Sequence, residues 1–397
     1  MKNNTYDFMT YQGNNLQALG FSAKKAPTWS PFMFVCIVIA LVCYGLVTLY
    51  SASYDEALRH GLPSSYYFSR QIIFALLGFF VFIIIRWIPM RWIQRSIPFL
   101  LLLSLLLMVL TLITPWGVER LGARRWLQIG SLPSFQPSEL LKISAVLALA
   151  LILSKWDKQS FYPVGASLII ILISALLIIG QRDYSTTLVF LLVALALLAI
   201  GGVRLRYIAM SIFLLGSGAV VFLFIEPYRI RRVVSFLFPN IDPSGLNWQV
   251  QKSLEAITSG GILGKGLGQG VFKLGLIPEV QSDFIFASLA EEMGLAGILI
   301  FFVLFIGFAF LGFSTARRLY SPHPKQRFMA LATFGITFMI TWQALVNLAV
   351  VTALLPPTGI PLPFFSQGGT NLFVMLCECG FIYTCMIEGD KEIIAYE

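Results

Sequence analysis

The chain has 397 residues, of which 57% are hydrophobic and only 12% are charged. This composition leaves too little polar surface to coat a soluble globule of this length, which excludes soluble enzymes and predicts a membrane protein with several spans. The formal net charge of +9 belongs partly to the loops that orient such a protein, so it does not imply a nucleic-acid partner.

The first 32 residues are polar and contain no small-residue cleavage site, so we expect a cytoplasmic tail over 1–32 and a retained first helix. A hydrocarbon core about 30 Å thick needs about 20 apolar helical residues. Ten stretches meet this need, which predicts an all-α membrane domain over 33–387 and a cytoplasmic tail over 388–397. The expected spans are 33–51, 71–88, 97–114, 138–153, 163–180, 185–203, 207–226, 284–313, 329–352 and 368–387.

Lysine and arginine gather in the loops after the second, fourth, sixth and eighth expected spans. The positive-inside rule therefore places those loops and both termini in the cytoplasm. The loops 115–137, 227–283 and 353–367 then face outward, and the loop 227–283 is long enough to carry the chemistry of an active site.

The outward loop before the fourth span departs from the enrichment of lysine and arginine in cytoplasmic loops. It contains Arg124 and Arg125, which are followed by Trp126. In the fourth span, Glu139 and Lys142 fall three apart on one helical face, where an acid and a base can neutralise each other. Such a pair indicates a polar cavity. The alternative is that the arginines bind lipid head groups, Trp126 is an interfacial aromatic, and Glu139 with Lys142 is a structural ion pair.

The large outward loop starts with Arg229, Arg231 and Arg232, whose guanidinium groups suit phosphate oxygens. A glycine-rich run over 259–270 follows, and it allows close approach of the backbone to a ligand or to another helix. The run lacks the spacing and the preceding strand of a nucleotide-binding phosphate loop, so a nucleotide site is not expected.

Asp283 ends the large loop, where an apolar helix is expected to meet water. A carboxylate in that position, near several arginines, is the best candidate for a general base. The alternative is that Asp283 is the N-cap of the eighth helix. Glu291 and Glu292 follow inside the eighth span, where acids are costly unless they are paired or functional.

The cysteines and histidines indicate no metal site. The two histidines, His60 and His323, fall on opposite sides of the expected membrane, and the five cysteines lack metal-ligand spacing and serve as apolar filler. These cysteines are Cys36, Cys43, Cys377, Cys379 and Cys385.

Six segments together resemble the SEDS membrane proteins, the shape, elongation, division and sporulation family that includes FtsW, RodA and SpoVE. The segments are 122–126, 135–142, 227–232, 259–270, 283–294 and 356–369, and the resemblance covers 122–380. It implies ten spans and a peptidoglycan glycosyltransferase that polymerises lipid II, the undecaprenyl-diphosphate-linked disaccharide pentapeptide. It also places this activity at the outer face of a bacterial cytoplasmic membrane.

The resemblance carries the family's catalytic aspartate onto Asp283. The expected substrate-binding residues are Trp126, Glu139, Lys142, Arg229, Arg231, Arg232 and Lys265. The expected supporting polar residues are Arg124, Arg125, Gln136, Ser138, Glu291, Glu292 and Ser366. The chain departs from the family where Gln281 replaces a usual histidine and where Gln367 replaces a usual tyrosine, which puts local packing near the last span in doubt.

The residue pattern and the family resemblance together lead to one hypothesis. The reaction is a single displacement that inverts the anomeric carbon of the donor sugar. Asp283 would remove the proton of an acceptor hydroxyl while the arginines neutralise the departing diphosphate. A septal, FtsW-like role is favoured, with a RodA-like elongation polymerase or a lipid II flippase as alternatives. A scaffold that only recruits other proteins would not need polar residues inside its spans.

The expected partners are lipid II, a class B penicillin-binding transpeptidase and other divisome proteins. The resemblance implies the transpeptidase, because members of the family act with a single-span class B penicillin-binding transpeptidase, and one loop is the only sizeable part of this chain expected outside the bilayer. No cofactor motif is evident, and a divalent-cation requirement stays open.

Overall fold

The computed structural model describes residues 29–120, 122–128, 130, 133–156, 162–210, 212 and 246–396. Its helices are α2 (Ser30–Arg59), α3 (Tyr66–Trp87), α4 (Met90–Ile113), α5 (Pro137–Ser154), α6 (Tyr162–Gly180), α7 (Tyr184–Ile200), α10 (Leu246–Ser259), α11 (Ile285–Leu319), α12 (Pro324–Val351) and α13 (Gly369–Tyr396). Two short strands, β1 (Gly117–Arg120) and β2 (Ala123–Leu127), form an antiparallel hairpin.

The predicted helical membrane fold is confirmed. Eight of the described helices are long and apolar enough to cross a membrane, and α7 is a shorter apolar helix of 17 residues. The tail 1–28, nearly all of the expected seventh span and the arginines at 229–232 lie outside the described residues. The count of ten spans and the assignment of the faces therefore stay predictions.

Several helices continue beyond their expected apolar spans. Helix α2 runs to Arg59 and α11 to Leu319, because backbone hydrogen bonds continue where the hydrophobic pattern ends. Helix α11 is interrupted at Gly294, where φ is +62°. The loop 227–283 also contains a helix of its own, α10.

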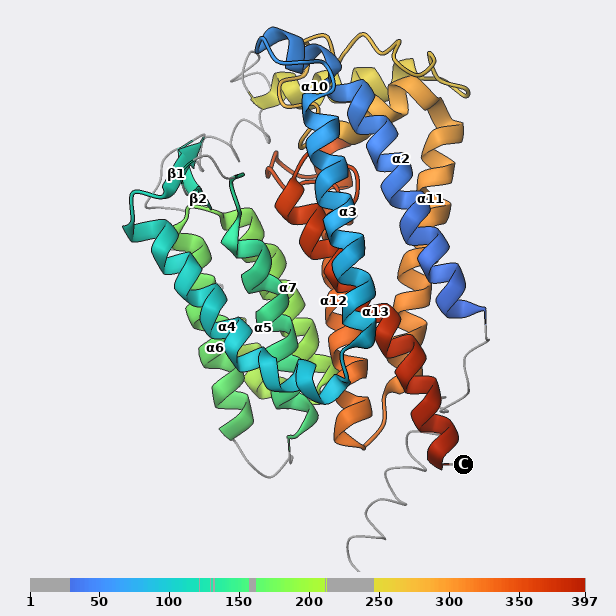
Figure 1. The fold of residues 1–397 in the computed structure, drawn as a ribbon. Helices are drawn as coiled ribbons and strands as arrows, with labels where there is room; N and C mark the ends of the chain where they lie inside the picture. Colours follow the sequence, from blue (N-terminus) through green and yellow to red (C-terminus); the bar gives the residue numbers. More distant parts are fainter. Residues whose placement is uncertain are drawn as a thin grey trace, which may run out of the picture.

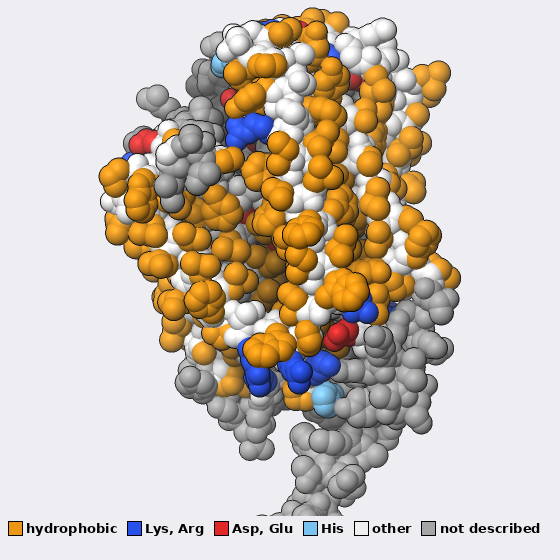
Figure 2. Space-filling model, viewed as in Figure 1, with side chains coloured by type: hydrophobic (Ala, Val, Ile, Leu, Met, Phe, Trp, Pro, Cys, Tyr) orange, Lys and Arg blue, Asp and Glu red, His pale blue; other side chains and the backbone are white. Residues whose placement is uncertain are grey.

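The helices form two groups that meet at α5 and α12 (Figure 1). The hairpin, α4, α6 and α7 lie on the α5 side, while α2, α3, α11 and α13 lie on the α12 side. Almost every residue of α5 is buried, whereas α3 and α4 expose most of their apolar side chains. The surface in Figure 2 is accordingly dominated by hydrophobic side chains along the helices, with Lys and Arg gathered at the end opposite α10.

Helices α3 and α4 diverge although only two residues connect them. They meet at one end of the bundle and separate toward the other, because α3 packs on α13 while α4 packs on α5 (Figure 1). Figure 2 shows the surface hollowed between them. The opening faces sideways, in the plane where lipid would surround the helices.

An aromatic cluster joins α2, α11 and the loop that precedes α13. Phe301 of α11 contacts Phe365 with ring centroids 5.3 Å apart, and Phe308 contacts both Phe34 and Phe364. Gly45 of α2 permits this contact, since a Cβ there would lie only 2.2 Å from the carbonyl oxygen of Phe364. The loop is therefore held tightly against the bundle.

Candidate functional site

Asp283 lies in a turn directly before α11. The backbone N–H groups of Ser282 and Asp283 both donate to the carbonyl oxygen of Glu279, at 2.9 and 3.2 Å. Glu279 itself adopts a left-handed conformation with φ of +53°. The turn leaves the Asp283 side chain half-buried, with one carboxylate oxygen accepting a hydrogen bond from Ser282 Oγ at 2.8 Å.

The alternative that Asp283 is the N-cap of its helix is wrong. The N-cap of α11 is Phe284, and no side chain caps it. The physical reason is that the turn begun at Glu279 extends one residue further than a cap at position 283 would allow.

Asn347 of α12 fixes the backbone around this carboxylate. Its side-chain amide donates to the carbonyl oxygens of Asp283 and Ile360, at 2.8 and 2.7 Å. The same loop brings Gly359 beside the carboxylate, because a Cβ on Gly359 would lie 3.5 Å from Asp283 Oδ2. Asn347 thus ties α12, the start of α11 and the loop 353–368 together at one point.

Ser366 makes a second tie to the same segment. Its hydroxyl donates to the carbonyl oxygen of Ser282 at 2.5 Å and accepts from the Leu362 N–H at 2.7 Å. The N–H of Gln367 donates to the carbonyl oxygen of Gln281 at 2.9 Å. The structure therefore brings Ser366 and both positions that depart from the family pattern into contact with the Asp283 turn.

Glu279 is a further carboxylate beside Asp283. Loss of hydration in the loop raises the pKa of Glu279, and the negative charges of Asp283 and Glu56 raise it further, while His60 acts to lower it. Gln281 donates to the Glu279 carboxylate at 3.4 Å. The loop end thus concentrates negative charge around the proposed base.

Glu139 and Lys142 form the expected pair in α5, with Lys142 Nζ 3.0 Å from Glu139 Oε1. Both side chains are buried, and Glu139 also accepts a hydrogen bond from Asn371 of α13 at 2.9 Å. Lys142 and Glu139 both interact electrostatically with Glu378, a buried carboxylate on α13. The cluster therefore links the two helix groups inside the bundle.

The segment from Ser366 to Asn371 connects this buried cluster with the Asp283 turn. Ser366 contacts Ser282 at one end of the segment, while Thr370 and Asn371 contact Gln136 and Glu139 at the other. Five residue steps span at most about 18 Å of extended chain. The two predicted clusters are therefore parts of one region. The hydroxyl of Ser138 is buried there and has no hydrogen-bond partner among the described residues.

The hairpin residues are placed by contacts within their own helix group. Arg124 donates to the carbonyl oxygens of Leu112, Thr114 and Gly117, so its guanidinium closes the end of α4. Arg125 donates to the carbonyl oxygen of Arg182 at 2.9 Å. Trp126 lies on β2 opposite Val118 of β1, and the hairpin packs on α4 and α5.

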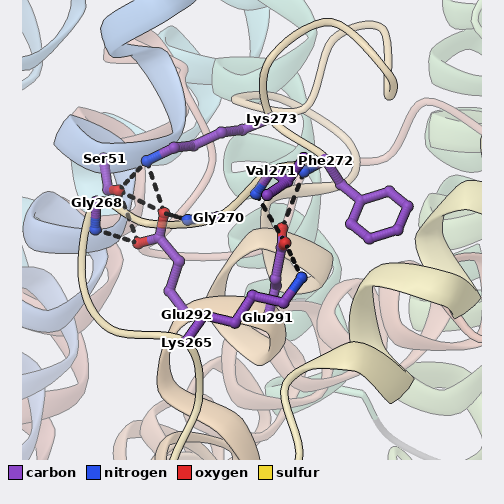
Figure 3. Close-up of polar contacts among 9 residues, drawn as sticks. All are labelled: Ser51, Lys265, Gly268, Gly270, Val271, Phe272, Lys273, Glu291 and Glu292. Atoms are coloured by element: carbon purple, nitrogen blue, oxygen red, sulfur yellow. Dashed lines mark hydrogen bonds and ion pairs between the residues drawn. The ribbon is translucent and has the colours of Figure 1, made fainter.

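The glycine-rich run packs on α11 through two buried carboxylates (Figure 3). Glu291 accepts from Lys265 Nζ and the Val271 N–H, both at 2.7 Å, and from the Phe272 N–H at 3.2 Å. Glu292 accepts from Ser51 Oγ and Lys273 Nζ, both at 2.7 Å, and from the N–H groups of Gly268 and Gly270. Lys265 is therefore paired with a buried acid, and both acids bind backbone N–H groups of the loop.

Sequence reasoning missed three buried polar side chains, namely Gln71, Asn347 and Glu378. Gln71 of α3 donates to the carbonyl oxygen of Ser366 and accepts from the Gly368 N–H, both at 3.2 Å. Asn347 and Glu378 lie inside expected apolar spans, which is a signal the sequence did contain, because a polar group at that depth needs a partner. Gln71 lies at the edge of its expected span, where the sequence gives no such signal.

Comparison with known sequences shows similarity along nearly the whole chain. A family model described as FTSW_RODA_SPOVE, cell cycle protein, matches residues 31–390. A Borreliella burgdorferi protein named probable peptidoglycan glycosyltransferase FtsW is 36% identical over 353 residues, covering 88% of this chain and 94% of the relative. Stage V sporulation protein E of Bacillus subtilis is 35% identical over 360 residues, covering 88% of this chain and 95% of the relative.

Two solved structures share the fold. A chain from the structure named "Structural coordination of polymerization and crosslinking by a peptidoglycan synthase complex" has a TM-score of 0.74 and 28% identity, covering 90% of this chain and 98% of that one. The rod shape determining protein RodA of Thermus thermophilus has a TM-score of 0.65 and 26% identity, covering 91% and 97%. The similarity therefore concerns the whole helical arrangement.

Proposed function

Because the chain belongs to the FtsW/RodA/SpoVE family, we propose that it is a peptidoglycan glycosyltransferase that polymerises lipid II at the outer face of a bacterial cytoplasmic membrane. Its relatives from Borreliella and Geobacter carry the name of this activity. The observation that carries the proposal is the half-buried Asp283 carboxylate, which lies directly before α11 and whose backbone is held by Asn347.

In the proposed reaction, Asp283 accepts the proton of the 4-hydroxyl of the acceptor GlcNAc. The hydroxyl oxygen then attacks the anomeric carbon of the donor MurNAc, and a new carbon–oxygen bond forms as the bond to the diphosphate oxygen breaks. Undecaprenyl diphosphate leaves, the anomeric centre inverts, and the proton stays on Asp283 until water removes it. A single displacement of this kind needs no second carboxylate as nucleophile.

In this proposal Arg229, Arg231 and Arg232 bind the leaving diphosphate and neutralise its charge, because guanidinium groups match phosphate oxygens in charge and geometry. Trp126, on the hairpin, is assigned to sugar contact. Lys142 and Glu139 contribute indirectly, since their pairing fixes α5 against α13 near the Ser366 segment. Lys265 acts in the same indirect way through Glu291.

The proposed biological setting is septal wall synthesis with a class B penicillin-binding transpeptidase. The FtsW names of the relatives support the septal role, with the elongation role as the alternative. A similar chain occurs in a complex described as joining polymerisation and crosslinking, which supports the transpeptidase partner. We place both termini and the tail 1–32 in the cytoplasm, where the tail could meet other divisome proteins.

The test is polymerisation of labelled lipid II by the purified full chain in detergent, with and without its transpeptidase, followed by separation of glycan strands on a gel. Asp283→Asn is expected to lower the rate at least about a hundredfold, because general base catalysis contributes that much or more. Glu255→Gln, which removes a carboxylate on α10 paired with Lys252, is the control and should keep activity.

Polymer formed at the normal rate by Asp283→Asn would refute the assignment of the base. Detergent removes the second compartment, so polymer formed there cannot come from a flippase that only moves substrate. Repeating the assay with EDTA tests the divalent-cation requirement.

A further inference from the structure

The glycine-rich loop between α10 and α11 presents apolar side chains to its surroundings. Ile262, Leu263 and Leu267 are 72%, 81% and 55% exposed. Soluble surfaces rarely expose several large apolar side chains together without a binding role. The position of the loop against α11 indicates what covers these side chains.

The loop contacts α11 at the break in that helix. The N–H of Leu295 donates to the carbonyl oxygen of Gly261 at 2.9 Å, and the N–H of Ala296 donates to that of Ile262 at 3.1 Å. Gly294 interrupts the helix immediately before these two residues. Ile262 therefore lies at the height where the long regular part of α11 starts.

That height matches the outer edge of the hydrocarbon core. The residues 295–316 precede Arg317 and Arg318 in the last turn of α11, and 22 residues of helix extend roughly 33 Å. The core of a bilayer is about 30 Å thick. With the arginines at one interface, Leu295 and the adjacent loop reach the opposite interface.

The exposed loop residues also continue the lipid-facing side of α11. Large apolar side chains recur along that helix at helical spacing and are 47–70% exposed, and they are Leu295, Leu299, Ile300, Val303, Ile306 and Phe310. Figure 2 shows hydrophobic side chains along the α11 side up to the end that carries the loop. The loop thus lengthens the exposed apolar surface of α11.

The loop is held firmly enough to keep this exposure. Its backbone N–H groups are bound by Glu291 and Glu292 (Figure 3). Gly264 lets the chain lie directly on α11, because a Cβ there would be 2.1 Å from the carbonyl oxygen of Glu292. With its backbone fixed on the helix, the loop has to direct Ile262 and Leu263 outward.

We propose that the loop 261–267 is a membrane anchor whose apolar side chains, Ile262, Leu263 and Leu267, insert among the acyl chains of the outer leaflet. The anchor fixes the height of the outer end of α11 relative to the membrane surface. The anchor binds lipid and requires no protein partner.

The test uses the full chain with its five native cysteines replaced and one cysteine introduced, labelled with the fluorophore NBD, in phosphatidylcholine nanodiscs. The matched pair is Leu263→Cys and Gln269→Cys, since Gln269 is an exposed polar residue of the same loop. Ile262→Cys is a second anchor position in case Leu263→Cys fails to fold. Retained chromatographic behaviour confirms the folded state of each variant.

The Leu263 label is expected to emit at shorter wavelength and to be quenched several-fold more by doxyl-labelled lipid than the Gln269 label, with iodide in water showing the reverse order. Equal quenching of both labels by iodide would overturn the proposal. A Leu263 label that is shielded from water only after a single-span transpeptidase is added would also overturn it, because the loop would then be a protein docking surface.

Discussion

Asp283 owes its position to side chains that never touch its carboxylate. Asn347 and Ser366 bind backbone oxygens on the two sides of the residue, so the carboxylate is aimed by main-chain hydrogen bonds. Such fixed geometry is what a general base needs, since proton transfer depends on hydrogen-bond reach to the substrate hydroxyl. In the proposed reaction Asp283 is the group that reacts, whereas Asn347 and Ser366 position it.

The raised pKa of Glu279 predicts that the stability of the protein depends on pH. Its pKa is raised in the folded protein by lost hydration and by Asp283 and Glu56, so its charged form is disfavoured by folding. The stability that belongs to this group is present below the ordinary carboxyl pKa and is lost as pH rises through the raised value.

Glu279→Gln should therefore raise the melting temperature relative to the wild type more at about pH 7.5 than at about pH 5. Thermal melting of the purified protein in detergent measures the difference, with Glu255→Gln as the control. A gain that grows on acidification would contradict the electrostatic explanation.

At the level of elements, the glycine-rich run shows how packing against a helix can require glycine. Gly264 has φ of +79° and faces the backbone of α11 at close range, whereas Gly268 has φ of +82° and faces open space. The two positions share the cost of a left-handed backbone but differ in what a side chain would meet.

Gly264→Ala should consequently destabilise the protein by about 1–3 kcal/mol more than Gly268→Ala, which is the range for forcing extra atoms into a packed contact. Melting temperatures of the two variants in detergent measure this difference. If the two variants have the same melting temperature, backbone strain alone explains the destabilisation at both positions. The close packing of the loop on α11 would then contribute nothing.

Hydropathy alone located most of the helices, because the length of each run of apolar residues can be counted directly in the sequence. It could not locate the hairpin, whose strands are only 4 and 5 residues long and carry no clear alternation. It also left the role of the glycine-rich run open, because close approach to a ligand and close approach to α11 require the same residues. The structure shows the close approach to α11, with Gly264 against the backbone of Glu292.

The site was partly predictable for a similar reason. Glu139 and Lys142 are three residues apart, so their pairing follows from helix geometry. Glu378, Asn347 and Gln71 find partners that are distant in the sequence, and only the tertiary fold brings those partners close. The N-cap alternative for Asp283 failed because the exact end of a turn depends on such contacts.

For the whole molecule, the buried cluster of Glu139, Lys142 and Glu378 lies where the two helix groups meet. Lys142→Met would leave two buried carboxylates without their cation, which should cost about 3–5 kcal/mol, as for other broken buried pairs. Thermal melting and chromatographic behaviour in detergent report the loss.

The double variant Glu139→Gln/Lys142→Met removes one acid together with the base and should recover part of that stability. Asn371 can still donate to the new amide oxygen, so α5 and α13 stay connected. A single variant as stable as the double variant would show that the cluster does not hold the groups together electrostatically.

The divergence of α3 from α4 has a kinetic consequence. Because that hollow opens sideways, a lipid-linked donor would arrive by two-dimensional diffusion within its leaflet instead of from bulk solution. The concentration that governs turnover is then the number of donor molecules per unit area of membrane. Dilution with inert lipid would slow the enzyme at constant molarity, and the potency of a competing inhibitor would follow its partition coefficient into the bilayer.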